Sequence, residues 1–519
     1  MSFPLVLVIA ALSGFIALSY EIVWYRAYAF VSQGSPAAFG LLLGAYLEGL
    51  AFGSLVSRRY CREGDAAFQE SALRPLAAFV YLANVVSLLV VPGLGAIAAH
   101  TTSWRMAFAL VIPAAGLLGG TLPLIAHFGI RPDERAGERL SYVYLANILG
   151  SVAGSLLTGF VLFDHLTLGA ITTSLAVVGV ALSLLLYLAS RPARARVGLA
   201  VAAAVASVAL ALLASPALHR RLYERLIWGP EQAQHPALAE IVENRHGVIA
   251  VEPNGTVWGG GAYDGRFNTS LLQDRNSVVR AYVVAALHPS PRRLLLIGLS
   301  TGSWAQVLVH MPGVEHLTAI EINPGYLDLI RHHAEVSSLL TNPKVSVVID
   351  DGRRWLRRHP SERFDVIVMN TTWHYRAHIT NLLSTEFLQI ARSHLAPGGV
   401  LFYNTTSSRD AVRTGIEVFP HALRFHNFLA VSDSPFALSR DHWERSLRAW
   451  SIDGAPVIDP SQPDQATRLD RLLGLLDPAR EQLPADRIED RPSLLATHAD
   501  AHVITDDNMW SEWWSPYAP

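Results

Sequence analysis

The stretch RLLLIGLSTGS, residues 293–303, joins a short apolar run to a turn that contains two glycines. The run Arg293–Ile297 has the length and composition of a buried strand, and an amphipathic stretch follows the turn. Glycine lets a strand-to-helix turn bring its backbone amides close to a ligand, so Gly298, Ser300 and Gly302 are candidate cofactor-binding residues. Such a turn also occurs where no ligand binds, and the segments around it have to decide between the two interpretations.

The same alternation of apolar and amphipathic segments continues along the chain. It predicts an α/β fold with a parallel, doubly wound sheet, because strands that are buried on both faces are apolar throughout. The predicted strands are Arg293–Ile297, Leu317–Glu321, Val345–Ile349, Asp365–Met369 and Val400–Tyr403, with helices near 303–310, 324–333, 353–358 and 384–394. Ligands of such sheets bind beyond the carboxyl ends of the strands, so candidate site residues are those that end or follow each strand.

Carboxylates stand at two of these strand ends. Glu321 ends the second strand, and a carboxylate in that place can accept hydrogen bonds from both hydroxyls of a ribose. Asp350 and Asp351 follow the third strand and can offer a carboxylate to an adenine amino group. The alternative for each is an ordinary solvated loop residue. Together with the glycine turn, however, three strand ends point to one nucleoside.

Composition divides the chain into two halves. A chain of 519 residues is too long for one hydrophobic core, and 51% of its residues are hydrophobic. Residues 1–215 consist of almost unbroken apolar runs, whereas the remainder holds most of the charge. We expect a multi-pass α-helical transmembrane domain over 1–215, a linker and small β-rich substrate region over 216–290, an α/β nucleotide-binding domain over 291–405, and a C-terminal extension over 406–519 that completes the soluble domain.

Charge and cysteine content exclude several classes of function. The formal net charge is −2, and no run of Lys and Arg is interleaved with aromatic residues, so we expect no nucleic-acid partner. Cys61 is the single cysteine, which excludes an intrachain disulfide and a Cys-rich metal site. We expect no metal. The first apolar run lacks a basic leader and is followed by further runs, so we do not expect a cleaved signal peptide.

Seven apolar runs are long enough to cross a bilayer as helices, each needing about 20 residues. They lie near 4–25, 37–57, 75–99, 104–127, 140–163, 167–189 and 197–215. The connectors 58–74, 128–139 and 190–196 carry ten arginines, which the positive-inside rule places in the cytoplasm with the N-terminus. With seven crossings the soluble domain would then lie outside. Either one run does not cross, or the domain works outside. We expect a multi-pass protein of the cell (inner) membrane whose soluble domain is cytoplasmic, since Arg220, Arg221 and Arg225 follow the last run.

Polar residues inside these runs need partners, because unpaired polar groups are costly in hydrocarbon. Glu21 and Glu48 either line a polar cavity for a cationic or amphiphilic substrate or bond to neighbouring helices. Asn84 and Asn147 face the same requirement. Glycines near 116–120 and 150–154 fit close packing of helices against one another.

Several segments, in order, carry a family pattern. They are the glycine turn, AIEINP (319–324), DGR (351–353), FDVIV (364–368), STEF (384–387) and LAPGGV (395–400). The chain resembles the spermidine synthase family of aminopropyltransferases over about 240–405, within the Rossmann-like class that binds S-adenosylmethionine. SGFIALSYEIVWYR (13–26), NILG (147–150) and ITDDN (504–508) resemble motifs of membrane-fused spermidine synthase-like proteins. The resemblance implies a Rossmann-like transferase domain that uses S-adenosylmethionine or its decarboxylated form, with Glu321 on the ribose and Asp351 at the adenine.

The resemblance fails at positions that concern the reaction. Asn370 follows the fourth strand where these aminopropyltransferases have the aspartate that accepts the proton of the amine, and an amide cannot accept it. His374 and His378 in the following loop are candidate bases, because histidine titrates near neutral pH. The alternative for both is an ordinary loop histidine. Asn370 can still orient an acceptor through its carbonyl, so all three residues are catalytic candidates.

The predicted acceptor region also departs from the family. Asp264, Asn268 and Asp274 lie in a segment that resembles the substrate-binding strand and gatekeeping region, and they are candidate substrate-binding residues. Val278 and Arg280, however, stand where the family has a tyrosine and a glutamate. This substitution weakens the expectation of a polyamine substrate.

Three functions remain open from the sequence. The first is a membrane-anchored transferase that moves an aminopropyl or other alkyl group from a sulfonium nucleotide to a small amine or amphiphilic acceptor. The second is an S-adenosylmethionine-dependent methyltransferase that acts on a membrane-soluble acceptor. The third is a non-catalytic polyamine or nucleotide sensor, or a carrier. The bilayer is the expected partner, and the sequence leaves the acceptor, a homo-oligomer and any transport role open.

Overall fold

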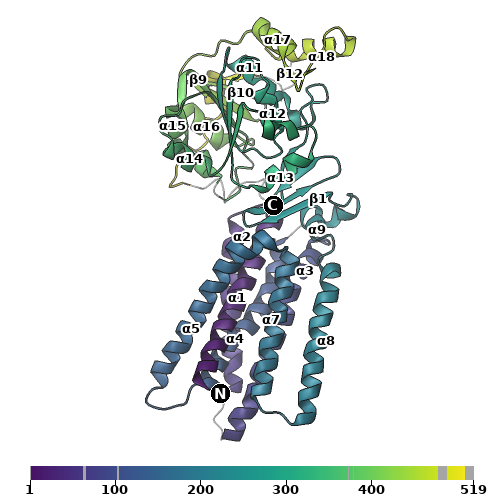
Figure 1. Ribbon diagram of the computed structural model, residues 1–519. Coiled ribbons are helices and arrows are strands. Elements are labelled where there is room, and N and C mark those ends of the chain that lie inside the picture. Colours follow the sequence, from purple (N-terminus) through teal and green to yellow (C-terminus); the bar gives the residue numbers. More distant parts are fainter. Residues whose placement is uncertain are drawn as a thin grey trace. The chain divides into compact units, whose positions relative to one another are not determined.

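The computed structural model describes residues 2–61, 66–101, 104–371, 373–377, 379–476 and 488–508. The chain divides into two compact units between Val248 and Ile249. The first unit is built almost entirely from helices, and the second is an α/β unit (Figure 1).

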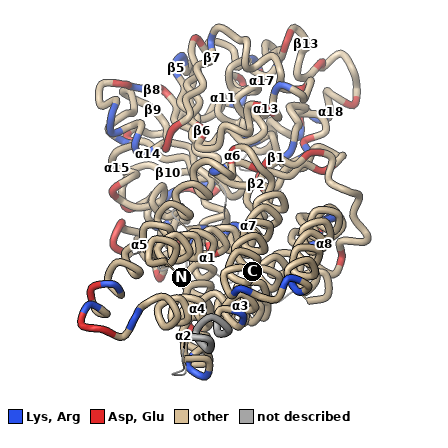
Figure 2. Tube along the Cα trace, turned by 60° about the horizontal axis from the view of Figure 1, so that its bottom comes forward, with Lys and Arg blue, Asp and Glu red and all other residues tan. Residues whose placement is uncertain are grey.

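All seven predicted apolar runs form long helices of the first unit. They are α1 (Phe3–Val31), α2 (Ala37–Ser57), α3 (Ala66–Ala98), α4 (Val111–Gly129), α5 (Ala136–Leu157), α7 (Leu168–Ala189) and α8 (Arg194–Leu218). In the part of the chain that the structure describes, seven helical segments are long and apolar enough to cross a membrane, by length and composition alone. In Figure 2 these helices are mostly uncharged along their lengths, and positively charged residues, all of them arginines, gather near their ends.

Glycines allow close packing in two helix pairs, α1 with α5 and α2 with α4. A Cβ atom added to Gly150 of α5 would lie 1.8 Å from the carbonyl oxygen of Ala11 in α1, and one added to Gly154 would lie 2.3 Å from that of Phe15. On α2, a Cβ added to Gly53 would lie 1.7 Å from the carbonyl oxygen of Gly116 in α4. The backbones therefore approach one another as closely as glycine allows, which confirms the predicted packing role.

The polar residues of these helices fall into two groups. The side-chain amide of Asn147 donates to the carbonyl of Ala10 on α1 at 3.1 Å, and that of Asn84 donates to Val80 within its own helix at 2.8 Å. The bond between helices accounts for Asn147, whereas the side-chain oxygen of Asn84 is buried and has no hydrogen-bond partner among the described residues. Glu21 is half-buried, whereas Glu48 lies on the exposed surface of α2.

The residues after α8 continue the first unit as α9 (Leu222–Trp228) and β1 (Glu240–Asn244). Polar contacts fasten this segment to the helices. The guanidinium of Arg26 in α1 donates to the carbonyl oxygens of Asn244 at 2.5 Å and Arg245 at 2.8 Å. The carboxylate of Glu243 accepts from the backbone N–H of Leu168 at 2.7 Å, and burial raises the pKa of Glu243.

The second unit is organised by an eight-stranded sheet in the order β14-β10-β11-β9-β8-β5-β6-β7. Its strands are β5 (Arg293–Ile297), β6 (His316–Glu321), β7 (Val345–Ile349), β8 (Phe364–Met369), β9 (Leu395–Asn404), β10 (His421–Phe425), β11 (Phe428–Ser432) and β14 (Glu489–Asp490). The five strands from β5 to β9 are parallel and agree with the predicted strands. The chain runs outward from β5 to β7 and then returns to the other side of β5, so the strand order reverses between β5 and β8. Ligands bind at such reversal points in doubly wound sheets.

Helices cover the sheet, and several begin with a side-chain cap. They are α10 (Val279–Tyr282), α11 (Val284–Leu287), α12 (Ser303–Val309), α13 (Gly325–His332), α14 (Gly352–Arg358), α15 (Thr385–Ser393), α16 (Arg409–Val418), α17 (Arg440–Ala449), α18 (Pro463–Leu473) and α19 (Arg491–Thr497). Ser384 accepts from the N–H of Phe387, and Ser408 accepts from that of Ala411, each at 3.2 Å. These bonds satisfy amides that the first helical turn leaves unpaired. A smaller antiparallel sheet, β2 (Gly247–Val251), β3 (Thr256–Gly259) and β4 (Ala262–Arg266), precedes the large one.

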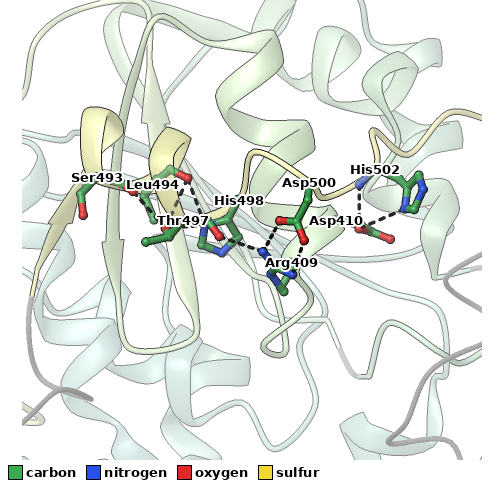
Figure 3. A network of polar contacts seen from close by, with 8 residues as sticks. All are labelled: Arg409, Asp410, Ser493, Leu494, Thr497, His498, Asp500 and His502. Atoms are coloured by element: carbon green, nitrogen blue, oxygen red, sulfur yellow. Dashed lines mark hydrogen bonds and ion pairs between the residues drawn. The ribbon is translucent and has the colours of Figure 1, made fainter.

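The C-terminal segment is fastened to the start of α16 by the polar network in Figure 3. Arg409 pairs with Asp500 and donates to the carbonyl of Thr497 at 2.8 Å, while the carboxylate of Asp410 accepts from the backbone N–H of His502 at 2.9 Å. The segment between β9 and α16 is therefore anchored at its far end by residues almost one hundred positions later in the chain.

Candidate active site

The glycine turn lies at the point where the strand order reverses. Gly298 has a φ of +89°, a conformation that favours glycine, and a Cβ added there would lie 3.1 Å from the carbonyl oxygen of Asn370. The backbone N–H of Asn370 donates to the carbonyl of Ile297 at 3.2 Å. The absence of a side chain at Gly298 therefore brings the ends of β5 and β8 together. Gly302, with a φ of +75°, is equally required at the start of α12.

Glu321 closes this turn from the neighbouring strand. One carboxylate oxygen accepts from the backbone N–H groups of Leu299 at 2.9 Å and Ser300 at 3.2 Å, and the other accepts from that of Asn323 at 2.8 Å. The side chain is 5% exposed, and burial raises its pKa to about 7 despite these three bonds. Glu321 is thus a near-neutral titrating group beside the predicted nucleoside position.

Asp350 and Asp351, whose carboxylates are predicted to contact the adenine, bond to residues of the helix that follows them. Asp351 caps α14, since its carboxylate accepts from the backbone N–H of Arg354 at 2.7 Å. Asp350 pairs with the guanidinium of Arg354, and its backbone N–H donates to the carbonyl of Glu321 at 3.1 Å. The two aspartates stand where the sequence predicts, next to Glu321, and each already has a structural partner.

Asp264, on β4 of the smaller sheet, contacts the glycine turn from the other side. Its backbone carbonyl accepts from the hydroxyl of Ser300 at 2.7 Å, and its carboxylate accepts from the hydroxyl of Tyr326. Burial raises the pKa of Asp264, while the charge of Arg376 and the Tyr326 bond oppose that rise. The glycine turn is therefore held between Asp264 and Glu321.

A cavity of about 210 Å³ opens beside the ends of β4, β8 and β9. Its lining residues are mostly amides, hydroxyls and aromatic rings: Tyr263, Asp264, Gly265, Asn276, Arg280, Asn370, Thr371, Trp373, Asn404, Thr406, Ser407 and Asn427. Among these described residues, Asp264 is the carboxylic acid and Arg280 is the strong base.

A chain of hydrogen bonds connects one wall of the cavity. Asn427, which precedes β11, donates from its amide to the side-chain oxygen of Asn404 at 2.8 Å. The amide nitrogen of Asn404 donates to the carbonyl of Thr371 at 3.0 Å, so the wall reaches the end of β8. The same Asn404 oxygen accepts from the backbone N–H of Thr406 at 2.8 Å. This wall is polar, neutral and held in place by its own bonds.

Arg280 of α10 is the cation of the cavity. Its guanidinium donates to the side-chain oxygen of Asn427 at 2.7 Å and to the backbone carbonyls of Asn276 at 2.7 Å and Ser277 at 2.9 Å. It lies over the ring of Phe428, 5.1 Å from the centroid. Burial lowers the pKa of Arg280 to about 10, so the side chain stays charged at neutral pH.

Comparisons with known proteins agree on one family. A family model described as "Spermine/spermidine synthase domain" matches residues 279–410, from α10 to the start of α16. Residues 279–410 are thus similar to the spermine/spermidine synthase domain. The polyamine aminopropyltransferase of Mycobacterium tuberculosis is 27% identical over 412 residues, which cover 74% of each chain. Polyamine aminopropyltransferase 2 of Streptomyces coelicolor is 29% identical over 414 residues, covering 74% of this chain and 70% of the relative.

The crystal structure of a probable spermidine synthase from Corynebacterium glutamicum matches this chain with a TM-score of 0.35 and 17% identity. The match covers 52% of this chain and 97% of that one. The alignments with the two relatives are longer than the second unit, so they include part of the helical unit as well. The resemblance drawn from the sequence is confirmed, and with it the expectation of a transferase enzyme.

The second unit places the predicted catalytic residues unequally. Asn370 lines the cavity at the end of β8. His374 is buried behind the wall, where its Nδ1 lies 3.0 Å from the hydroxyl oxygen of Thr406, and burial lowers its pKa. A lowered pKa keeps His374 neutral at pH 7, as a base requires. His378 lies outside the described residues.

Of the predicted substrate-binding residues, only Asp264 lines the cavity. The amide of Asn268 donates to the carbonyl of Arg275 at 2.9 Å, and its oxygen accepts from Ser270 at 3.1 Å. Asp274 accepts from the backbone N–H of Val279 at 2.9 Å and from Arg468 at 2.9 Å. Asn268 and Asp274 thus shape the loop before α10, and a direct role in binding remains a prediction.

Of the twelve lining residues, only Asp264 and Asn370 were predicted as site residues, and those missed include Arg280, Asn404, Thr406 and Asn427. The strand-end rule could have found Asn404, because it ends β9 as Glu321 ends β6. Asn427 sits in the tight turn between β10 and β11, which no motif marks. Arg280 was visible only as a departure from the family. In the described residues, no group of three or more His, Cys, Asp or Glu side chains is arranged to hold a metal ion.

Proposed function

We propose that the chain is a membrane-anchored transferase of the spermidine synthase type, which moves an aminopropyl group from decarboxylated S-adenosylmethionine to an amine. The observation that carries the proposal is the cavity beside Gly298 and Asn370 at the strand reversal of a spermine/spermidine synthase domain. Relatives named polyamine aminopropyltransferases, which match 74% of the chain, support it.

The reaction is a displacement at carbon. The neutral amine nitrogen of the acceptor forms a bond to the aminopropyl carbon next to the sulfonium, and the carbon–sulfur bond breaks. Sulfur keeps the electron pair and leaves as a neutral thioether nucleoside, while the new ammonium nitrogen loses one proton to a base or to water. Holding the two reactants in line supplies much of the rate, which a preformed pocket at the sheet edge favours.

The residues near the turn divide these tasks. Glu321, when ionised, is placed to accept the ribose hydroxyls of the donor, and the turn amides that it now holds lie at the start of α12. The carbonyl of the Asn370 side chain orients the amine by accepting one of its N–H bonds. His374 reaches the cavity wall through Thr406 and is the candidate that takes the proton.

The apolar surface of the first unit supports the membrane anchor. Side chains such as Leu213, 80% exposed, and Leu199, 72% exposed, lie on α8, which has no buried residue. Phe160 and Leu149 of the fifth span are exposed to 62% and 59%. Water would penalise such a surface, whereas lipid covers it without cost.

Donor binding and product formation test the proposal with the detergent-purified full chain. We expect decarboxylated S-adenosylmethionine to bind in a calorimeter, and mass spectrometry to show an aminopropylated amine and methylthioadenosine. Glu321→Gln should weaken donor binding by about tenfold or more, since charge-assisted bonds to the ribose are lost. Glu315→Gln is the matched control, because Glu315 precedes the same strand and is exposed. With S-adenosylmethionine supplied as the donor in a parallel assay, methylated product and S-adenosylhomocysteine would instead establish the methyltransferase. Binding without product from either donor would favour a sensor.

A further inference from the structure

Arg280 is a buried cation whose guanidinium has more N–H donors than the protein acceptors shown around it. A guanidinium carries five N–H groups, and the structure shows three of them donating to protein, to Ser277, Asn276 and Asn427. Within the described residues no partner is shown for the remaining two, one on each terminal nitrogen. Arg280 is 9% exposed and lines the cavity, so these donors belong to a site with little access to bulk water.

No carboxylate among the described lining residues pairs with this charge, and Asp274, whose charge acts on Arg280 from outside the lining, is itself paired with Arg468. Asp264 is the one acidic residue among the described lining residues, and its carboxylate already accepts the hydroxyl of Tyr326. Arg376 provides Asp264 with a second compensating charge. The other lining side chains near Arg280, those of Asn276 and Asn427, are neutral amides. The cavity is therefore short of negative charge.

This balance disfavours a substrate whose only charges are ammonium groups. A second ammonium in the cavity would lose water and meet a buried guanidinium, and both effects oppose binding. A carboxylate has the opposite preference, because the planar fork of a guanidinium matches its two oxygens and the bond is charge-assisted.

We infer that the cavity binds a substrate that carries a carboxylate, and that Arg280 pairs with it. The inference rests on the proposed function and names its substrate class. The carboxylate belongs either to the acceptor, an amino acid with a second amine, or to the donor, S-adenosylmethionine that has not been decarboxylated. In the second case the displaced bond is the same carbon–sulfur bond, and the transferred group is aminocarboxypropyl.

Two matched substrate pairs distinguish these sources. Ornithine has the structure of putrescine with one added carboxylate. S-adenosylmethionine differs from decarboxylated S-adenosylmethionine by the same group. With the full chain in detergent, product formation is measured for ornithine against putrescine with the decarboxylated donor, and for the two donors with putrescine. We expect the carboxylate-bearing member of at least one pair to be preferred by about tenfold or more. Preference for putrescine and for the decarboxylated donor together would overturn the inference.

Variants of Arg280 show whether this residue produces the preference. Arg280→Met should abolish it, and Arg280→Lys, which keeps the charge without the fork, should retain part of it. Arg491→Met is the control, since Arg491 is a partly buried arginine that donates to the carbonyl of Ile416 and does not line the cavity. An unchanged preference in Arg280→Met, with the fold retained in circular dichroism, would show that Arg280 only braces the loop before α10.

Failure of the proposed function has a different signature. If no substrate combination gives product, the proposed transfer is wrong, and calorimetry of the four compounds separately still decides the inference. Tighter binding of a carboxylate-bearing compound, lost in Arg280→Met, supports the pairing. Equal or weaker binding of both such compounds rejects it.

Discussion

Glu321 is a buried carboxyl group whose oxygens accept three backbone N–H bonds. Burial raises its pKa from 4.5 to about 7, so the folded chain holds this proton more tightly than the unfolded chain. Its contribution to stability is therefore full below pH 4.5 and is lost as the pH rises through about 7. Donor binding should depend on pH with the opposite sign, because the ionised form accepts the ribose hydroxyls.

We predict that the affinity for decarboxylated S-adenosylmethionine rises by about tenfold between pH 6 and pH 8, as a group with a pKa near 7 becomes ionised. Over the same range the melting temperature of the donor-free protein should fall. Isothermal calorimetry and thermal unfolding measure the two trends. Glu321→Gln should flatten both, whereas the exposed Glu315→Gln should leave both unchanged. A pH dependence that survives Glu321→Gln would assign it to another group.

Individual site residues were predictable where they follow a strand. Glu321 ends β6 and Asn370 follows β8, as the sequence predicts, and Asn370 lines the cavity, while their roles in binding and catalysis stay predictions. Arg280 and Asn427 were not predictable in the same way, because their meeting depends on how the β10–β11 turn folds back onto α10. A hydrogen bond between residues 147 positions apart leaves no periodic signal in the sequence.

Among the elements, the parallel strands were predictable and the antiparallel edge was not. The runs from β5 to β9 are apolar because both faces are buried, and the turn residues mark their ends. β10 and β11 pair antiparallel next to β9, and β14 contributes only Glu489 and Asp490. A two-residue strand such as β14 carries too little pattern to be separated from a loop, since its pairing with β10, far back in the chain, creates it.

The helix pair α1 and α5 offers a prediction at the scale of elements. Gly150→Ala should destabilise the first unit by about 1–3 kcal/mol, because the new Cβ would lie 1.8 Å from the carbonyl oxygen of Ala11 and the helices must separate. Thermal unfolding of the detergent-solubilised protein measures the loss. Gly159→Ala, in the continuation of the same span, meets nothing within 4 Å and should not destabilise. Equal effects of the two substitutions would contradict close packing at Gly150.

For the whole molecule, the seven helices predict that residues 190–196 and Arg220 lie on opposite sides of the membrane. Between them is α8, the candidate span with the highest mean hydropathy, 2.5, and arginines flank it at both ends. Reporter fusions or cysteine labelling at 193 and 220 test this directly, and readings on the same side would remove α8 from the spans.

The same labelling shows on which side of the membrane residue 220 lies, and two arguments about that side oppose each other. The ten arginines of the connectors favour an external second unit, whereas a sulfonium donor made inside the cell requires a cytoplasmic one. We expect 220 to be cytoplasmic, with the connectors outside against the arginine bias. An external reading would contradict the proposed donor, because the active site could not reach its supply.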